Sequence, residues 1–299
     1  MSRSFVSATS LDDALAALAE GARPVAGGTD LVVGSRQGKA PLPEALVAID
    51  RIEALQGLRR EENILVLGAL VTHEALVFDP VVREHLTAIA DACAIVGSHA
   101  TRAQGTIGGN LMNASPAMDA GGPLLCFDAS ISLRSATEER TIGLSALWTG
   151  PGVTVAAPQE LLTAILVPLP APGTGSAYVR LEYRRQMEIA IVGATAVVTV
   201  DAERVTDARI AITALSPTIH RVPEAEAALT GTDGGDAAVA AAAAATASAA
   251  SPISDVRGSA AYRTAMAEVI ARRAIGAALL RARGGSVPIP ASPALHGAD

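Results

Sequence analysis

Residues 104–119 read QGTIGGNLMNASPAMD, with a paired glycine between Thr106 and Asn110 and a Ser-Pro turn before Asp119. A second paired glycine lies far upstream, in residues 26–31, AGGTDL. Glycine lets the backbone adopt φ > 0 and bring successive N–H groups to one side, which forms an anion-binding nest without a cationic side chain. Two such turns suit the two sides of one pyrophosphate.

The polar residues beside each turn strengthen this interpretation. Thr29 and Asp30 add a hydroxyl donor and an acceptor at the edge of Gly27-Gly28. The Thr106 hydroxyl and the Asn110 amide flank Gly108-Gly109 in the same way. A single Gly-Gly pair between strands is usually a structural turn, so the prediction of a phosphate site rests on the two turns together.

The composition excludes several classes of protein. The chain has 299 residues, a net charge of −7 and 2% aromatic residues, which argues against an extended nucleic-acid surface. No apolar run approaches the roughly 20 residues of a membrane-spanning helix, and the N-terminus lacks the apolar region of a signal peptide. We therefore expect a cytoplasmic protein without a membrane span.

Neither cysteines nor histidines show metal-ligand spacing. Cys93 and Cys126 stand in apolar contexts and form no CxxC pair, which predicts buried, inert thiols. The five histidines form no HxxxH or HExxH motif. The chain also lacks GxGxxG, GxxxxGK[ST] and GxSxG motifs, and we identify no catalytic acid, base or nucleophile in it.

Hydrophobic periodicity and breaker residues predict an α+β chain in two parts. A Pro- and Gly-rich linker at 168–176 separates them. Before it, the pattern predicts helices over 9–20 and 80–96, and strands in 23–34 on both sides of the glycine turn, 45–50, 63–76 on both sides of Gly68, 129–135 and 160–170. After it, two or three long strands over 176–215 precede helices from 223 onward, and the tail 284–299 is expected to be disordered.

Several motifs together resemble a known family. AGGTDL, LGALVTHEAL (67–76), TIGGNLMNASPAMD, YRRQMEIAIVGATAVV (183–198) and SPISDVRGSAAYRTAMAEVIARRA (251–274) are similar to the FAD-binding medium subunit of the molybdenum hydroxylases. This is the flavoprotein subunit of the xanthine dehydrogenase and carbon monoxide dehydrogenase type. The resemblance runs from about residue 5 to about residue 281.

The resemblance implies a fold and a division into domains. A two-subdomain FAD-binding module of the vanillyl-alcohol oxidase (PCMH) type would occupy 1–170, with subdomains of about 1–55 and 56–170. A small C-terminal flavoprotein domain, with a three-stranded antiparallel sheet and a helical bundle, would occupy 176–283.

It also implies roles for individual residues. One wall of the FAD pyrophosphate site would be the backbone of Ala26, Gly27, Gly28, Thr29 and Asp30. The opposite wall would be Thr106, Gly108, Gly109 and Asn110.

Three further residues match positions near the cofactor in relatives. Asp119 would face the adenosine ribose, Leu162 the adenine end, and Arg180 would lie near the cofactor. From the residues alone, the alternatives are a turn aspartate for Asp119, a core residue for Leu162 and a solvated cross-strand charge for Arg180.

The implied function is that of an FAD-dependent oxidoreductase subunit with no catalytic side chain of its own. Electrons would pass from a large molybdenum-cofactor subunit through [2Fe–2S] clusters in a small subunit to FAD, and then to NAD⁺, a quinone or dioxygen. The assembly would be a dimer of heterotrimers. The alternatives are a self-contained FAD-dependent oxidase and a flavin-free assembly subunit.

The sequence departs from the family pattern at two points. Relatives carry an asparagine where this chain has Ala103, and the four-cysteine insertion of one branch is absent. The first departure leaves the glycine turn intact, and the second removes any extra iron–sulfur cluster on this chain.

Overall fold

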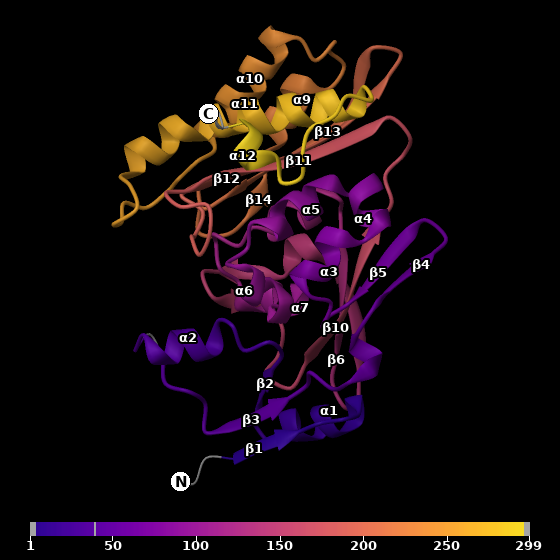
Figure 1. Cartoon of the computed structure of the whole chain (residues 1–299), viewed down its shortest axis with the longest axis vertical. Helices are drawn as coiled ribbons and strands as arrows, with labels where there is room; N and C mark the ends of the chain where they lie inside the picture. Colours follow the sequence, from indigo (N-terminus) through magenta and orange to yellow (C-terminus); the bar gives the residue numbers. More distant parts are fainter. Residues whose placement is uncertain (1–3, 39, 296–299) are drawn as a thin grey trace.

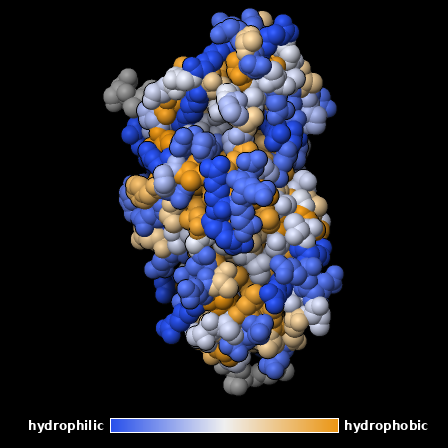
Figure 2. Space-filling model, turned by 90° about the vertical axis from the view of Figure 1, so that its right-hand side faces the viewer, coloured by the Kyte–Doolittle hydropathy of each residue, from blue (hydrophilic) through white to orange (hydrophobic). Residues whose placement is uncertain are grey.

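The structure is a computed structural model that describes residues 4–38 and 40–295. The molecule is elongated, with a small N-terminal sheet at one end and the C-terminal helices at the other (Figure 1). On the face shown in Figure 2, hydrophobic residues are interspersed with hydrophilic ones along the whole length. Among the described helices, none has the length and apolar character needed to cross a membrane.

A three-stranded parallel sheet of order β1-β3-β2 builds the N-terminal end. The strands are β1 (Ser4–Ser7), β2 (Arg23–Val25) and β3 (Ala45–Ala48). The helices are α1 (Leu11–Ala19), α2 (Leu31–Arg36) and the 3₁₀ helix η1 (Glu53–Leu55). The Ser10 hydroxyl caps α1 by accepting the Asp13 N–H at 3.1 Å, and Leu15 and Leu18 of α1 are buried in the core of this subdomain.

A five-stranded antiparallel sheet of order β4-β5-β10-β6-β7 forms the middle of the molecule. Its strands are β4 (Leu58–Glu61), β5 (Ile64–Gly68), β6 (Ser130–Arg134), β7 (Glu139–Gly143) and β10 (Leu161–Pro168). The minor elements are η2 (Leu144–Ala146), β8 (Trp148–Gly150) and β9 (Val153–Thr154).

This part of the chain also forms six short helices, several of which lie beside the sheet in Figure 1. They are α3 (His73–Phe78), α4 (Pro80–His85), α5 (Thr87–Ala94), α6 (His99–Gln104), α7 (Ile107–Asn113) and α8 (Gly121–Cys126). The helix expected over 80–96 is present as α4 and α5, which are separated at Leu86. Of the six, α7 packs on the central strand β10, which places the second glycine stretch over the sheet.

A four-stranded antiparallel sheet of order β11-β12-β13-β14 forms the C-terminal domain. The strands are β11 (Thr174–Leu181), β12 (Val192–Asp201), β13 (Arg204–Thr213) and β14 (His220–Arg221). The helices are α9 (Pro223–Leu229), α10 (Asp236–Ser248), α11 (Ala260–Ala282) and α12 (Ala291–Leu295).

This sheet is covered on both faces. Helix α11 packs on β11 and β12, while α5 and α8 of the preceding domain contact the same sheet. Gly175 lets α11 approach, because a β-carbon there would lie 2.2 Å from the Ala278 carbonyl oxygen. The apolar character of β11 to β13 on both faces follows from this double coverage.

Two local expectations from the sequence are wrong. The apolar segment after the first glycine turn forms α2 instead of a strand, because Gly28 (φ +68°) turns the chain and its carbonyl accepts the Val32 N–H at 3.0 Å. Similarly, β5 ends at Gly68, and the apolar residues that follow lead into α3 without forming a second strand.

Two expectations for the C-terminal part also need correction. The sheet has a fourth, two-residue strand, β14, beside the predicted three. The tail expected to be disordered is ordered from 284 to 295, because Ala291 and Ser292 are buried against the rest of the chain. Residues 296–299 of that prediction lie outside the described residues.

Candidate cofactor site

The structure brings the two glycine stretches into direct contact. A β-carbon added at Gly27 would lie 1.9 Å from the carbonyl oxygen of Gln104. One added at Gly105 would lie 3.4 Å from the Thr29 hydroxyl. The two segments are therefore neighbours at the level of their backbones, as two walls of one site must be.

The first stretch offers unused backbone donors. Within the described chain, no hydrogen bond uses the N–H group of Gly27, Gly28 or Thr29. Gly28 has φ +68°, the left-handed conformation that a nest requires. These residues are half-buried, so part of their surface is open to solvent.

The second stretch differs from the sequence prediction. Gly108 and Gly109 are helical residues of α7, neither has positive φ, and they form no second nest. Their N–H groups donate to the Ala69 carbonyl at 3.0 Å and the Thr106 hydroxyl at 3.1 Å. Gly108 is required for close approach, since its β-carbon would lie 2.6 Å from the Ala69 oxygen.

Asn110 leaves a polar atom without a partner. Its Oδ1 is buried and accepts no hydrogen bond. Buried side-chain polar atoms nearly always have a partner, so an orphan beside an exposed glycine (Gly109) indicates that a ligand completes the site. An amide presents either its oxygen or its NH₂ group, and the position therefore suits a hydroxyl or a phosphate oxygen.

A buried histidine supports the second wall from behind. The backbone N–H of His73 donates to the Gly105 carbonyl at 3.0 Å, and the imidazole Nδ1 of His73 lies 3.4 Å from the Cys93 Sγ. Burial, together with the nearby Arg102 charge, lowers the pKa of His73 to about 4. The imidazole is therefore neutral and acts in packing.

Both cysteines are buried, as the sequence predicts. Burial raises the pKa of Cys93 and of Cys126 well above the usual range. Throughout 4–38 and 40–295, no three His, Cys, Asp or Glu side chains come together as a metal site would need.

Asp119 and Arg180 form a buried ion pair. The Arg180 Nη1 donates to Asp119 Oδ2 at 2.7 Å, with the Arg180 side chain 0% exposed. Tyr178 donates its hydroxyl to Asp119 Oδ1 at 2.8 Å, and Arg180 Nε donates to Glu182 at 3.0 Å. Burial is the largest single influence and lowers the pKa of Arg180, but Asp119, Tyr178 and Glu182 together outweigh it and the net shift is upward. The alternative of a solvated cross-strand charge is wrong for Arg180.

Tyr178 and Glu182 were not singled out by the sequence analysis. They stand two residues either side of Arg180, and alternate residues of a strand share a face. The two-residue periodicity of a strand could therefore have identified Tyr178 and Glu182 as neighbours of Arg180 on one face.

Leu162 belongs to the same hydrophobic core as Ile107 of the second glycine stretch. Leu162 is 3% exposed at the start of β10, in the core of the middle domain. Asp119 lies close enough to Cys93 to raise the pKa of that thiol, and Cys93 in turn contacts His73 behind the second wall. Of the remaining predicted residues, Ala26 packs on the N-terminal core and Asp30 directly precedes α2.

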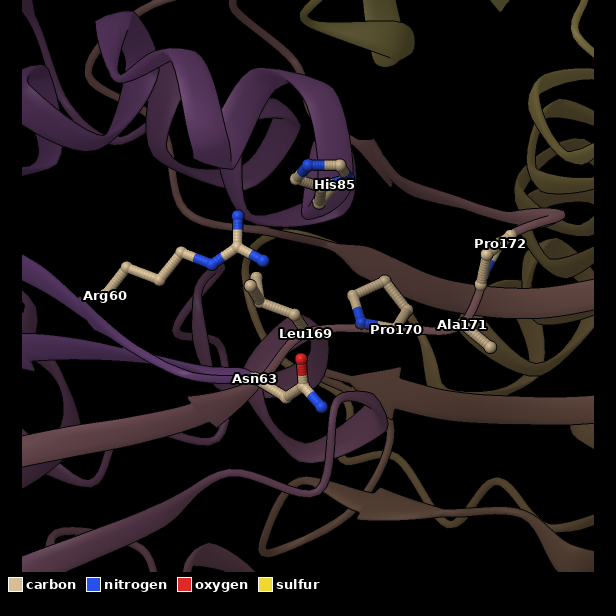
Figure 3. Close-up of a pocket in the computed structure, with 7 residues that line it drawn as sticks. All are labelled: Arg60, Asn63, His85, Leu169, Pro170, Ala171 and Pro172. Carbon is tan, nitrogen blue, oxygen red and sulfur yellow. The ribbon is translucent and has the colours of Figure 1, made fainter.

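A hollow of about 370 Å³ lies elsewhere, between the β4-β5 hairpin, α4 and the segment that joins the domains. Arg60, Asn63 and His85 line it together with residues 169–172 (Figure 3). None of the residues predicted from the sequence lines it. The candidate site is therefore the junction of the glycine stretches.

Comparisons with known proteins agree with the motifs. Residues 1–170 match the family described as the FAD binding domain in molybdopterin dehydrogenase. Residues 176–278 match the CO dehydrogenase flavoprotein C-terminal domain.

Individual relatives match along most of their length. The chain is 35% identical to the carbon monoxide dehydrogenase medium chain of Afipia carboxidovorans over 90% of this chain and 93% of that one. It is 33% identical to the 6-hydroxypseudooxynicotine dehydrogenase complex subunit alpha of Paenarthrobacter nicotinovorans, over 93% and 95%. The reconstituted CO dehydrogenase structure from Oligotropha carboxidovorans superposes with a TM-score of 0.90 at 33% identity, covering 94% of this chain and 99% of that one.

The order of the two matched domains, the extent of the matches and the paired glycine stretches agree with the resemblance seen in the sequence. The chain belongs to the family of FAD-binding medium subunits of the molybdenum hydroxylases and is an oxidoreductase subunit that carries the FAD-binding domain.

Proposed function

We propose that this chain holds FAD in a heterotrimeric molybdenum hydroxylase. A large molybdenum-cofactor subunit and a small [2Fe–2S] subunit are its partners, in a cytoplasmic dimer of heterotrimers. Bound FAD supplies the redox chemistry by accepting electrons from the small subunit and releasing them to NAD⁺, a quinone or dioxygen. The protein supplies binding, orientation and exclusion of water.

The observation that carries the proposal is the junction of the two glycine stretches. Gly27, Gly28 and Thr29 have free N–H groups, and their segment contacts the second stretch at Gln104 and Gly105. In the second stretch, Asn110 has a buried amide oxygen without a partner. The free backbone N–H groups of the first stretch are neutral donors that stabilise a pyrophosphate without a cationic side chain. The Asn110 amide can turn its NH₂ group toward the same anion and then donates as well.

The remaining residues take the roles that the family pattern implies. The backbone from Ala26 to Asp30 binds one side of the pyrophosphate, and Thr106, Gly108, Gly109 and Asn110 form the other side. Here Gly108 lets α7 approach β5, and Thr106 orients α7. Asp119 faces the ribose, held in place by Arg180, and Leu162 closes the adenine end.

The names of the relatives contain different substrates, although all of these relatives are similar in sequence to this chain. One name contains carbon monoxide, another 6-hydroxypseudooxynicotine and a third glyceraldehyde. We infer that substrate choice belongs to the large subunit and that this chain serves the flavin end of the electron path.

A binding measurement on the purified chain tests the proposal directly. Titration with FAD should quench flavin fluorescence in a saturable manner and give a yellow protein with one flavin per chain. A chain that remains colourless with excess FAD would support the flavin-free assembly subunit instead.

Co-expression with adjacent genes tests the assignment of partners. A complex that contains molybdenum, iron and FAD is expected, and its flavin should be reduced by substrate only when all three subunits are present. If the chain alone oxidises a small alcohol or amine, it is a self-contained oxidase.

A further inference from the structure

Residues 286–292 cross the boundary between the two domains and are here called the strap. Arg281, on α11, donates through Nη2 to the carbonyls of Val287 and Pro288 at 3.1 Å each. The Ala291 N–H donates to Asp91 Oδ1 at 3.0 Å. The strap is therefore fixed at both ends to α11 and α5.

The strap covers the free edge of β11. Among the described strands, β12 is the sole partner of β11, so the outward-facing backbone groups of β11 need other partners. The Arg180 N–H donates to the Ser292 hydroxyl at 3.0 Å, and the Tyr178 N–H donates to Asp91 Oδ2 at 3.2 Å. The Ser176 carbonyl accepts from Arg281 at 2.6 Å.

The residues whose backbone is hydrogen-bonded along this edge also donate side-chain hydrogen bonds to Asp119. Tyr178 and Arg180 project to Asp119 from alternate positions of β11, at 2.8 and 2.7 Å. Any shift of the β11 backbone moves both donors away from the carboxylate. Ser292, which is 0% exposed, fixes the backbone of Arg180 directly.

We propose that Ser292 is a positioning residue for the cofactor site. Its hydroxyl sets the place of the Arg180 backbone, and thereby the orientation of the Asp119 carboxylate toward the bound nucleotide. This inference rests on the proposed function, in which Asp119 faces the ribose of FAD. It assigns a role in cofactor binding to a segment far in sequence from both glycine stretches.

The full-length chain with Ser292→Ala tests the inference. The matched control is Ser176→Ala, which removes another buried serine hydroxyl from the same edge of β11. Ser176 stands four residues before Arg180 on the strand, and its Oγ accepts from the Ala88 N–H at 3.0 Å and lies 2.9 Å from the Thr87 Oγ1. For each protein, the FAD dissociation constant is measured by fluorescence quenching, and unfolding of the FAD-free form by urea.

Ser292→Ala should raise the FAD dissociation constant about five-fold, the effect of one misplaced hydrogen bond. Both variants should lower the urea midpoint of unfolding by a similar amount, since each loses one buried hydrogen bond. Ser176→Ala should nevertheless leave FAD affinity at the wild-type value. Wild-type affinity in Ser292→Ala, or an equal loss in both variants, would overturn the positioning role. Failure of the wild-type chain to bind FAD would instead overturn the proposed function.

Discussion

At the scale of single residues, Gly27 carries the contact between the two walls. Its missing side chain lets the backbone at Gln104 approach, since a β-carbon would lie 1.9 Å from that carbonyl oxygen. We expect Gly27→Ala to force the segments apart, with an overpacking cost of about 1–3 kcal/mol. The loss should appear as a fall in FAD affinity measured by fluorescence titration.

Gly276→Ala is the matched control. Gly276 is an exposed residue within α11, and a β-carbon there meets nothing within 4 Å. Alanine is the better helix former by about 1 kcal/mol, so the variant should be slightly stabilised with unchanged FAD affinity. Equal FAD binding in Gly27→Ala and Gly276→Ala would disprove the role of the close contact.

His73 should make stability depend on pH. Its pKa of about 4 lies below the ordinary histidine value of 6.5, so the unfolded chain binds the proton more readily. Stability is fully present above about pH 6.5 and falls toward pH 4, by about 1.4 kcal/mol per pH unit at most.

The variant His73→Gln, which has no imidazole, isolates this contribution. Between pH 7.5 and pH 5, urea denaturation should show a loss about 2 kcal/mol smaller in the variant than in the wild type. The carboxylates that titrate in the same range are common to both proteins and cancel in the difference. An identical pH dependence in the two proteins would mean that His73 is not held neutral.

At the scale of elements, the N-terminal cap of α7 stabilises a helix whose first residues belong to the candidate cofactor site. The Thr106 hydroxyl accepts the Gly109 N–H at 3.1 Å. Thr106→Val keeps the shape and removes this cap, which should cost about 1 kcal/mol of stability and also weaken FAD binding.

Ser10→Ala separates these two effects. Ser10 caps α1 with the same geometry, accepting the Asp13 N–H at 3.1 Å, but it is an exposed residue of the N-terminal subdomain. It should lose similar stability in thermal unfolding while FAD affinity stays at the wild-type value. A fall in affinity in both variants would show that Thr106 acts only through general stability.

The elements were predicted well where local pattern decides them. The helix at α1 and the long strands β11 to β13 follow from capping, periodicity and β-branched residues. Prediction failed at α2 and at α7, where contacts outweigh pattern. Val32 and Val33 favour a strand, yet Gly28 turns the chain and leaves α2 without a buried residue.

The site was predicted in part for the same reason. Motif spacing identified the two glycine stretches, and the structure places them in contact. Motif spacing did not reveal that Gly108 is needed for close packing, because the Ala69 carbonyl that it approaches lies in a different segment of the chain. The Arg180–Asp119 pair and Ser292 depend on tertiary contacts that no local pattern contains.

At the scale of the whole molecule, a buried ion pair joins the domains. Arg281 of α11 donates to Asp91 of α5 at 2.6 Å, with side chains 8% and 0% exposed. We expect Arg281→Met to leave the Asp91 charge buried and to destabilise the protein by about 3–5 kcal/mol in urea denaturation.

The same substitution on the same helix provides the control. Arg272 pairs with Glu268 at 3.0 Å, but both side chains are more than 40% exposed. Arg272→Met should therefore change stability by less than about 0.5 kcal/mol. Comparable losses in the two variants would show that burial of the pair contributes nothing.

The central position of β10 has a consequence for synthesis on the ribosome. β10 pairs with β5 through Ile165 and Leu67, and with β6 through Ile165 and Ile131. Until β10 emerges, the edges of β5 and β6 that it will cover are open in addition to the outer edges at β4 and β7, and open edges promote aggregation of nascent chains. The interval between translation of β5 and translation of β10 is therefore when the growing chain depends most on chaperones.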